Sequence, residues 1–361
     1  MLHELGQPVE FKNGIIMKNR FMLAPLTNQQ SFEDGQLSEE EYKWLKMRAE
    51  GQFGIVMTCA SHVQESGKGF WGQLGIFSDS LIPGHQKLTA VIKKHGSLAL
   101  IQLQHAGMRS PKALLKHQPL CASNNLETGA RGLTLEEVIQ LREDFILAAL
   151  RAQKSGYDGV EIHGAHGYII TQFLSKEINK RTDLFGGSLV NRSRLLFEIV
   201  DGIREKCGDR FLIGVRLSPE KFGMDLDEIK LIAERLIEEN KIDFLDMSVW
   251  DYSKFPEDEK YNSKSLLKQF TELDRKKVLL TAAGKIRTGK DAAEALNAGL
   301  DFVTIGRSAI LHHDFPAKVI ENPDFNPIET PASKEHLRNE GVSEKFINYL
   351  LERFPKFVAE D

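Results

Sequence analysis

The feature that most constrains the fold is a regular alternation of short apolar runs with longer amphipathic patterns. Runs in which nearly every residue is apolar are typical of parallel strands that are covered on both faces. Eight such runs occupy Phe21–Ala24, Ile55–Cys59, Leu98–Leu103, Gly159–Ile162, Phe211–Arg216, Phe244–Ser248, Val278–Ala282 and Phe302–Ile305. Helical patterns lie between or after them at Ser38–Glu50, Pro83–His95, Leu135–Ser155, Leu189–Cys207, Leu226–Glu239, Ser263–Leu273, Gly289–Ala298 and Phe315–Ile320.

This order predicts an α/β protein, a (β/α)₈ TIM barrel. The alternative is a doubly wound open sheet, which has fewer strands and a glycine-rich first turn. The segment Gly67–Gly72 does match the G-x-G-x-x-G pattern of dinucleotide-binding proteins. However, no helical pattern begins until Pro83, and the acidic residue required on a second strand is missing. The barrel is therefore the favoured prediction.

The chain contains no repeat or linker, so we predict a single domain over residues 1–361. Residues 321–361 form a polar C-terminal extension that ends in an expected helix, Ser343–Phe354. Two irregular segments, Gln104–Gly132 and Lys176–Ser188, follow the third and fourth strands. Barrel enzymes build their sites from such loops.

Composition excludes several classes of function. With a formal net charge of -4 and a pI of about 6.3, the chain has no basic field for nucleic acid or an anionic membrane surface. Its three cysteines are scattered, without a CxxC pair. The first 20 residues lack an apolar signal core, and no apolar stretch is long enough to span a bilayer. We expect a cytoplasmic protein with a small-molecule substrate. The sequence leaves open whether the protein forms a homo-oligomer.

The segment Glu161–Tyr168 carries the clearest chemistry. It places two imidazoles, His163 and His166, and the phenol of Tyr168 at the end of the fourth apolar run. Two neutral ring N–H donors can converge on one oxygen, and a phenol nearby can deliver a proton. This set suits reduction of a polarised carbonyl system better than hydrolysis. A metal site is the alternative, but a catalytic zinc needs a third ligand that the pattern does not indicate.

Other polar or small residues stand at strand ends, which a barrel gathers around one mouth. Thr27, Ala60, Gln102 and Arg216 offer groups suited to a planar heterocycle with several carbonyls. Backbone N–H groups and positive charge for a phosphate can come from the ends of the seventh and eighth strands. The residues there are Gly284, Lys285, Gly306 and Arg307. FMN contains both a planar heterocycle with several carbonyls and a phosphate.

Several motifs resemble, in order and spacing, those of the Old Yellow Enzyme family of flavin oxidoreductases, the short type without an iron–sulfur cluster. The resemblance extends from about residue 19 to residue 315. Its motifs lie at Asn19–Thr27, Ile101–Gly107, His163–Ser175 and Asn179–Arg192.

The resemblance implies an FMN-dependent enzyme that is reduced by NADH or NADPH. It implies that Ala24, Pro25, Leu26 and Thr27 line the flavin, with Ala60 at the ring edge. Gln102 would hold the pyrimidine edge, and Arg216 would place positive charge near N1 and O2. His163 and His166 would bind the substrate carbonyl oxygen. Hydride would pass through flavin N5 to the β-carbon of an activated alkene, while Tyr168 protonates the α-carbon.

Two departures from the family bear on substrate choice. Met108 intervenes before Arg109 where the family often has His-Ala-Gly-Arg, and Gln29 replaces a tyrosine found in one bacterial branch. Two other classes of function stay open. One is a flavin-free barrel aldolase or isomerase acting on a phosphorylated substrate. The other is a non-catalytic flavin-binding protein, which has no need of the His163, His166 and Tyr168 donors.

Overall fold

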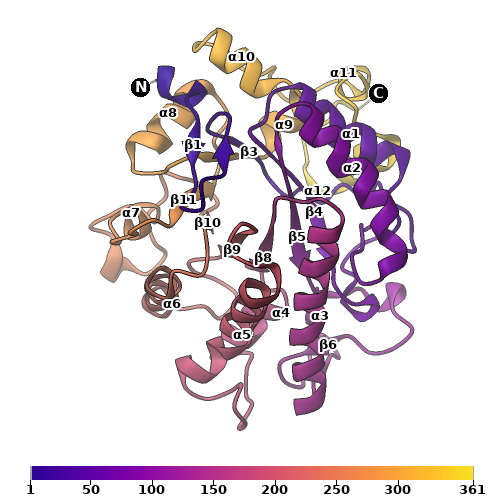
Figure 1. Cartoon of the computed structure of the whole chain (residues 1–361), viewed down its shortest axis with the longest axis vertical. Helices are drawn as coiled ribbons and strands as arrows, with labels where there is room; N and C mark the ends of the chain where they lie inside the picture. Colours follow the sequence, from indigo (N-terminus) through magenta and orange to yellow (C-terminus); the bar gives the residue numbers. More distant parts are fainter. Residues whose placement is uncertain (1, 361) are drawn as a thin grey trace.

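The computed structural model describes residues 2–360 and contains an eight-stranded parallel barrel (Figure 1). The strands follow in the order β11-β10-β9-β8-β5-β4-β3-β12. This confirms the predicted TIM barrel. The strands are β3 (Phe21–Leu23), β4 (Ile55–His62), β5 (Leu98–Gln104), β8 (Gly159–Gly164), β9 (Leu212–Leu217), β10 (Phe244–Ser248), β11 (Leu279–Ala283) and β12 (Val303–Ile305).

The barrel closes between β11 and β12 through a few specific bonds. The Asp301 N–H donates to the carbonyl of Leu280 at 2.9 Å, and the Asp301 carboxylate accepts from the Leu280 N–H at 2.7 Å. Higher in the barrel, the hydroxyls of Thr281 and Thr304 lie 2.9 Å apart and are buried. Side-chain bonds thus supplement the backbone where the last two strands meet.

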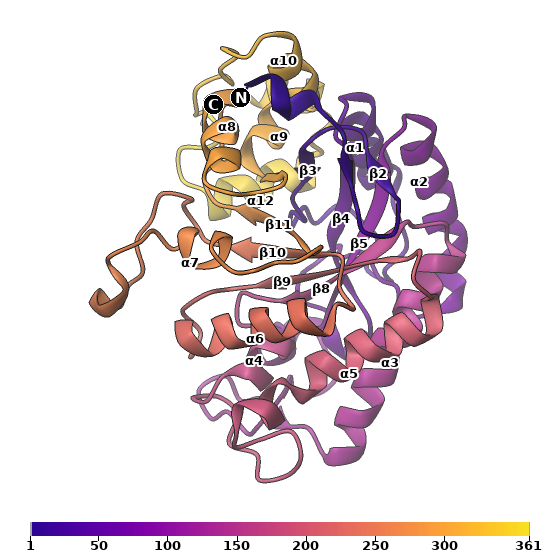
Figure 2. The same ribbon diagram turned by 60° about the vertical axis from the view of Figure 1, so that its left-hand side comes forward.

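A small hairpin and a ring of aromatic side chains form the core beneath the barrel strands. The hairpin pairs β1 (Val9–Glu10) with β2 (Ile16–Met17) (Figure 2). Phe11 packs edge-on against Phe244 and Phe302, with ring centroids 6.2 Å apart in each case. Gly214 makes room for these rings, since a Cβ there would lie 2.1 Å from Phe244 Cζ. The barrel interior is therefore a packed core at this level.

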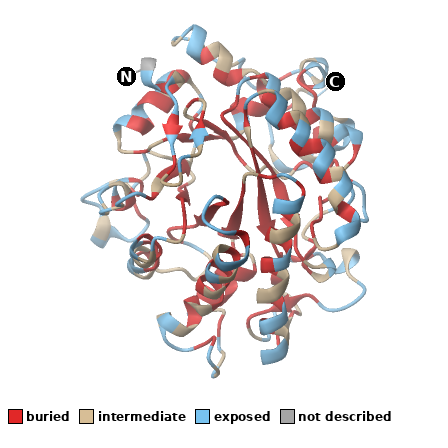
Figure 3. Cartoon of the chain, viewed as in Figure 1, coloured by how far each residue is buried: buried red, intermediate tan, exposed pale blue. Residues whose placement is uncertain are grey.

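Helices surround the barrel with their apolar faces inward (Figure 3). Figure 2 shows α3, α5 and α6 lying beside one another outside β8 and β9. The helices of this layer are α1 (Glu39–Glu50), α2 (Ile82–Lys94), α3 (Leu135–Lys154), α5 (Leu189–Cys207), α6 (Leu226–Glu239), α7 (Lys268–Thr271), α8 (Gly289–Asn297) and α10 (Phe315–Glu321). Helix α3 begins with a capping box between Thr134 and Glu137.

Some predicted elements differ from the observed ones. The helix expected over Ser263–Leu273 reduces to the four residues of α7, because its first part forms turns around Tyr261 and Ser265. Short helices that periodicity cannot detect also appear. They are α4 (Ile169–Leu174), α9 (Arg307–Leu311) and α11 (Lys334–Asn339).

The C-terminal extension folds back onto the barrel. Its expected helix is α12 (Glu344–Arg353), with Ser343 as N-cap. Arg48 of α1 fixes the preceding segment, since its guanidinium donates to the carbonyls of Ala309 and Glu340 at 2.9 and 2.7 Å. The same guanidinium lies 3.1 Å from the centroid of the Trp44 ring. Residues far apart in sequence thereby bring α12 to the mouth of the barrel.

Candidate active site

A cavity of about 330 Å³ opens at the carboxyl ends of the barrel strands. Every residue that the sequence analysis placed in the site lines it. These are Ala24, Pro25, Leu26, Thr27, Ala60, Gln102, His163, His166, Tyr168, Arg216, Gly284, Lys285, Gly306 and Arg307. A barrel explains the convergence, because it carries the ends of all eight strands to one face.

The end of β8 and the turn after it position the two histidines and the tyrosine. His166 and Gly167 both have positive φ angles, 62° and 72°, which reverse the chain within two residues. Tyr168 then becomes the N-cap of α4. As a result, the His163 ring centroid lies 5.1 Å from those of both His166 and Tyr168.

The two histidines are hydrogen-bonded to each other. Nδ1 of His166 lies 3.3 Å from Nε2 of His163, and Nε2 of His166 lies 2.7 Å from Oγ of Ser248. Both ring nitrogens of His166 therefore have partners, whereas Nδ1 of His163 is buried without one. His163 therefore keeps one ring nitrogen whose hydrogen-bonding capacity no described residue satisfies.

Burial keeps both imidazoles neutral. It lowers the pKa of His163 well below the ordinary value, and the neighbouring His166 and Arg216 act in the same direction. Burial also lowers the pKa of His166 to about 3, again reinforced by Arg216. Neutral rings each carry one N–H donor and one acceptor, so the pair can offer a hydrogen bond to an oxygen without placing a proton on it.

Arg216 and Gln102 form the polar floor of the cavity. Arg216 is 5% exposed and its Nε lies 3.3 Å from Oδ2 of Asp246. Gln102 is 1% exposed and donates through Nε2 to Oε1 of Glu161 at 2.6 Å. The sequence analysis assigned neither carboxyl group to the site.

The segments that follow β11 and β12 bring two arginines to the cavity. Arg307 and Arg287 both line it, and no acidic partner is found for either guanidinium within residues 2–360. Burial lowers the pKa of Arg307, and the nearby charge of Arg287 adds to this effect. Arg287 was not predicted. Lys285, which was, has its ammonium 2.9 Å from the Asp251 carboxylate, so its charge is already balanced.

The C-terminal extension contributes a wall that the sequence did not indicate. Tyr349 lines the cavity together with Thr27, and Phe354 lies with its ring centroid 5.6 Å from Cζ of Arg307. Trp250, in a loop after β10, faces the same space. The lining residues from the extension are Phe346, Tyr349, Leu350, Phe354 and Phe357.

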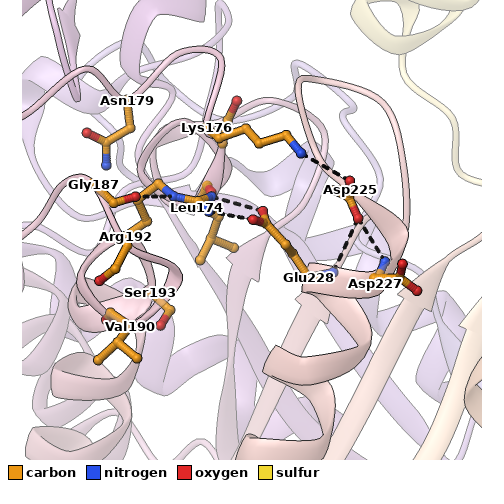
Figure 4. Close-up of polar contacts among 12 residues, drawn as sticks. Leu174, Lys176, Asn179, Gly187, Val190, Arg192, Ser193, Asp225, Asp227 and Glu228 are labelled. Atoms are coloured by element: carbon orange, nitrogen blue, oxygen red, sulfur yellow. Dashed lines mark hydrogen bonds and ion pairs between the residues drawn. The ribbon is translucent and has the colours of Figure 1, made fainter.

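The segment Asn179–Arg192, part of the family-like motif after the fourth strand, has a structural role. Arg192 donates to the carbonyls of Leu174 and Gly187 and forms two bonds with Glu228 of α6, the closer at 2.7 Å (Figure 4). Asn179 donates to two backbone carbonyls, each at 2.7 Å. Neither residue lines the cavity. This part of the motif holds the loop after β8 against α5 and α6.

The two departures from the family pattern lie outside the cavity lining. The Met108 N–H donates to Oε1 of Gln172 at 3.2 Å, and Arg109 donates to the His166 carbonyl at 2.5 Å. The guanidinium of Arg109 also lies 5.1 Å from the Tyr168 ring centroid. Gln29 has a φ of 57° and packs by its carbonyl against Gly72. The G-x-G-x-x-G segment is a loop, because the next α-helix begins only at Ile82.

Possible metal ligands gather elsewhere. In the described part of the chain, groups of three lie at His312, His336 and Glu340, and at His313, Asp314 and Glu340. Nε2 of His312 already accepts from the Ile328 N–H at 3.1 Å, and the Glu340 carboxylate accepts from His313. Neither group lines the cavity. None of the helices described could cross a membrane.

The donor set of the cavity fits FMN. An amide and a guanidinium suit the carbonyl-rich pyrimidine ring, and two arginines without acidic partners suit a phosphate at the other end. A flavin-dependent oxidoreductase is the class that this barrel and this cavity define. Residues 4–325 match the profile of the NADH:flavin oxidoreductase / NADH oxidase family. The chain belongs to that family, and it is an NAD(P)H-dependent flavin oxidoreductase with FMN as cofactor.

Individual relatives agree with this assignment. The chain is 35% identical over 337 residues to the probable NADH-dependent flavin oxidoreductase YqiG of Bacillus subtilis (strain 168), covering 90% of each protein. It is 31% identical to the NADH:acrylate oxidoreductase of Vibrio harveyi, but spans only 35% of that longer protein and 93% of its own length. The structure of the Old Yellow Enzyme homologue from Zymomonas mobilis superposes with a TM-score of 0.79 at 27% identity. That match covers 95% of this chain and 99% of the other.

These findings exclude the two other classes of function that the sequence analysis left open. A flavin-free aldolase or isomerase is excluded, because the family uses a flavin. A non-catalytic flavin-binding protein is excluded as well, since the chain is an oxidoreductase of that family.

Proposed function

We propose that this enzyme reduces the carbon–carbon double bond of α,β-unsaturated carbonyl compounds or similarly activated alkenes. The observation that carries the proposal is the cluster of His163, His166 and Tyr168 in the cavity, with Nδ1 of His163 buried and unpartnered. Reduction of an enone builds negative charge on its oxygen, and a neutral donor aimed at that oxygen stabilises the charge.

The proposal gives each side chain a task. Gln102 and Arg216 would hold the pyrimidine edge of FMN, Arg307 its phosphate, and the Ala24–Thr27 segment one side of the ring. Bound FMN supplies hydride, which it takes from NADH or NADPH. His163, oriented by its bond to His166, would bind the substrate carbonyl oxygen. The Tyr168 hydroxyl would deliver the proton to the α-carbon.

Two features support Tyr168 as the proton donor. Its ring lies beside His163, so an oxygen bound there brings the adjacent carbons close to the phenol. Its backbone is fixed at the start of α4, where its carbonyl accepts from the Gln172 N–H at 2.9 Å. A rigid support of this kind favours catalysis, because proton transfer needs a fixed geometry.

Absorbance spectroscopy in one anaerobic cuvette tests the proposal. We expect flavin absorbance to bleach when NADH or NADPH is added and to return when 2-cyclohexenone follows. Bleaching without recovery, over a panel of enones, nitroalkenes and maleimides, would reject activated alkenes as substrates. The unsubstituted ketone cyclohexanone serves as the control, since it has the carbonyl but no alkene to reduce.

A further inference from the structure

Four polar side chains from neighbouring strands form a continuous buried group at the floor of the cavity. Gln102 of β5 stands opposite Glu161 of β8, and Arg216 of β9 stands opposite Asp246 of β10. Gln102 and Arg216 line the cavity, whereas Glu161 and Asp246 lie behind them and are 0% exposed. The proposed function uses only the first two residues.

The contacts run from one end of the group to the other. Nε2 of Gln102 donates to Oε1 of Glu161 at 2.6 Å, and Nε of Arg216 lies 3.3 Å from Oδ2 of Asp246. The charge of Asp246 is one of the causes that raise the pKa of Glu161, which couples the two carboxyl groups electrostatically. Oε2 of Glu161 and both carboxyl oxygens of Asp246 are buried and have no hydrogen-bond partner in the described part of the chain.

The charges in this group do not balance if both acids are ionised. Two carboxylates and one guanidinium would leave a net negative charge in a space without solvent, and burying an uncompensated charge is costly. Neighbouring carboxylates that share a buried site cannot both ionise easily, so one retains a proton. In agreement, burial is the main cause that raises the pKa of Glu161 and of Asp246.

The surroundings decide which acid keeps the proton. Asp246 lies against the Arg216 guanidinium, which favours its ionised form. On the same strand as Glu161, the next titratable side chain is His163, and it is neutral. Oε1 of Glu161 is occupied as the acceptor for Gln102, so a proton belongs on Oε2, on the side of Asp246.

We propose that Glu161 is a neutral carboxylic acid that donates from Oε2 to Asp246 and acts as a positioning residue for the flavin site. In this arrangement the Gln102 amide gives an N–H to Glu161, which leaves its oxygen available to the cavity as an acceptor. The isoalloxazine ring carries an N–H donor at N3, which needs such an acceptor. Asp246, in turn, balances the charge of Arg216. This inference rests on the roles proposed above for Gln102 and Arg216.

Infrared spectroscopy tests the protonation state directly and does not depend on flavin. At pH 7 the protein should show the carbonyl stretch of a protonated carboxylic acid, shifted in D₂O and absent from Glu161→Gln. Glu41 is also fully buried, so Glu41→Gln is the matched control, and it should leave the Glu161 band in place. Incorporating carboxyl-¹³C glutamate into the unaltered protein moves the band without any substitution. A spectrum with no Glu161 band, labelled or not, would overturn the proposal.

Binding of FMN to the apoprotein tests the positioning role. Glutamine has the size of a protonated glutamate, and can accept from Gln102 while it donates to Asp246. We therefore expect Glu161→Gln to keep the FMN dissociation constant within about threefold, and Glu161→Ala to raise it at least about tenfold. Equal weakening by both variants would overturn the role. If unaltered protein and Gln102→Ala bound FMN equally well, the proposed role of Gln102 would fail instead, whatever the infrared result.

Discussion

At the scale of single residues, neutrality is the property that defines this site. Burial keeps His163 and His166 uncharged near neutral pH. Ser248 is hydrogen-bonded to His166, and His166 is hydrogen-bonded to His163, which fixes the His163 ring. Neutral donors suit the proposed reaction because they stabilise a developing oxyanion without protonating the substrate beforehand. The sequence predicted the residues, but the bond between the rings is a finding of the structure.

The first prediction concerns His163. His163→Ala removes the donor proposed for the carbonyl oxygen, and we expect alkene reduction to slow by roughly 10²–10³-fold, as for loss of one oxyanion-hole donor. Flavin content should not change, because the ring belongs to the substrate side of the proposed site. Stopped-flow reoxidation by 2-cyclohexenone measures the effect, and a rate equal to that of the unaltered enzyme would contradict the role.

A second prediction concerns Tyr168. Tyr168→Phe keeps the ring beside His163 and removes only the hydroxyl, so reoxidation by the enone should slow by roughly 10²–10⁴-fold. Reduction by NADH should proceed at its normal rate and provides the internal control. Were both half-reactions to slow by the same factor, Tyr168 would be a structural residue and another group would supply the proton.

At the scale of secondary-structure elements, the most consequential contact is that of the C-terminal extension with the barrel. The pattern of Ser343–Phe354 predicted a helix correctly, but its apolar face could equally cover another surface. Arg48 and the barrel mouth decide where α12 lies, since the guanidinium bonds to two backbone carbonyls beyond residue 300. The helix then completes the cavity through Tyr349 and its neighbours.

The third prediction tests this anchor. Arg48→Ala leaves the buried carbonyls of Ala309 and Glu340 without their donor, so we expect the free energy of unfolding to fall by about 2–6 kcal/mol, the usual cost of two unsatisfied buried acceptors. Urea denaturation followed by circular dichroism measures the loss. Lys46→Ala, on the same helix, removes an exposed pair with Glu50 and should cost less than about 1 kcal/mol. Similar midpoints for the two variants would contradict the anchoring role.

At the scale of the whole molecule, buried neutral histidines link stability to pH. Burial lowers the pKa of His62 and of His85 to about 4, and that of His105 to about 3. In the unfolded chain these rings titrate near 6.5. Between about pH 6.5 and 4 the unfolded state therefore binds more protons, and the free energy of unfolding must fall as the pH is lowered.

The fourth prediction follows from this linkage. Each fully depressed histidine adds a slope of up to about 1.4 kcal/mol per pH unit. A protonated Glu161 contributes a slope of opposite sign, which offsets only one of the histidines, so acidification from pH 7 to pH 5 should still destabilise the fold. Urea titrations at several pH values measure the slope. His117 is exposed, and His117→Asn should leave the slope unchanged. A free energy of unfolding that stays constant between pH 7 and pH 5 would contradict the prediction.

The sequence by itself determined the barrel and the set of side chains around its mouth. The apolar runs locate the strands along the chain. A closed barrel then brings residues near the strand ends, such as Thr27, Gln102 and Arg216, together. Both inferences depend on local pattern plus one topological rule, so contacts between distant segments were not needed.

Only the tertiary structure decided which further groups complete the site. Arg287 and Trp250 lie in irregular loops. Helix α12 is placed by contacts with α1, where Arg48 bonds to the Glu340 carbonyl just before α12 and Trp44 packs against Phe346. Asp251 balances Lys285, and the charge of Asp246 raises the pKa of Glu161, a residue on another strand. These features depend on distances between side chains of non-adjacent segments, which sequence periodicity does not encode.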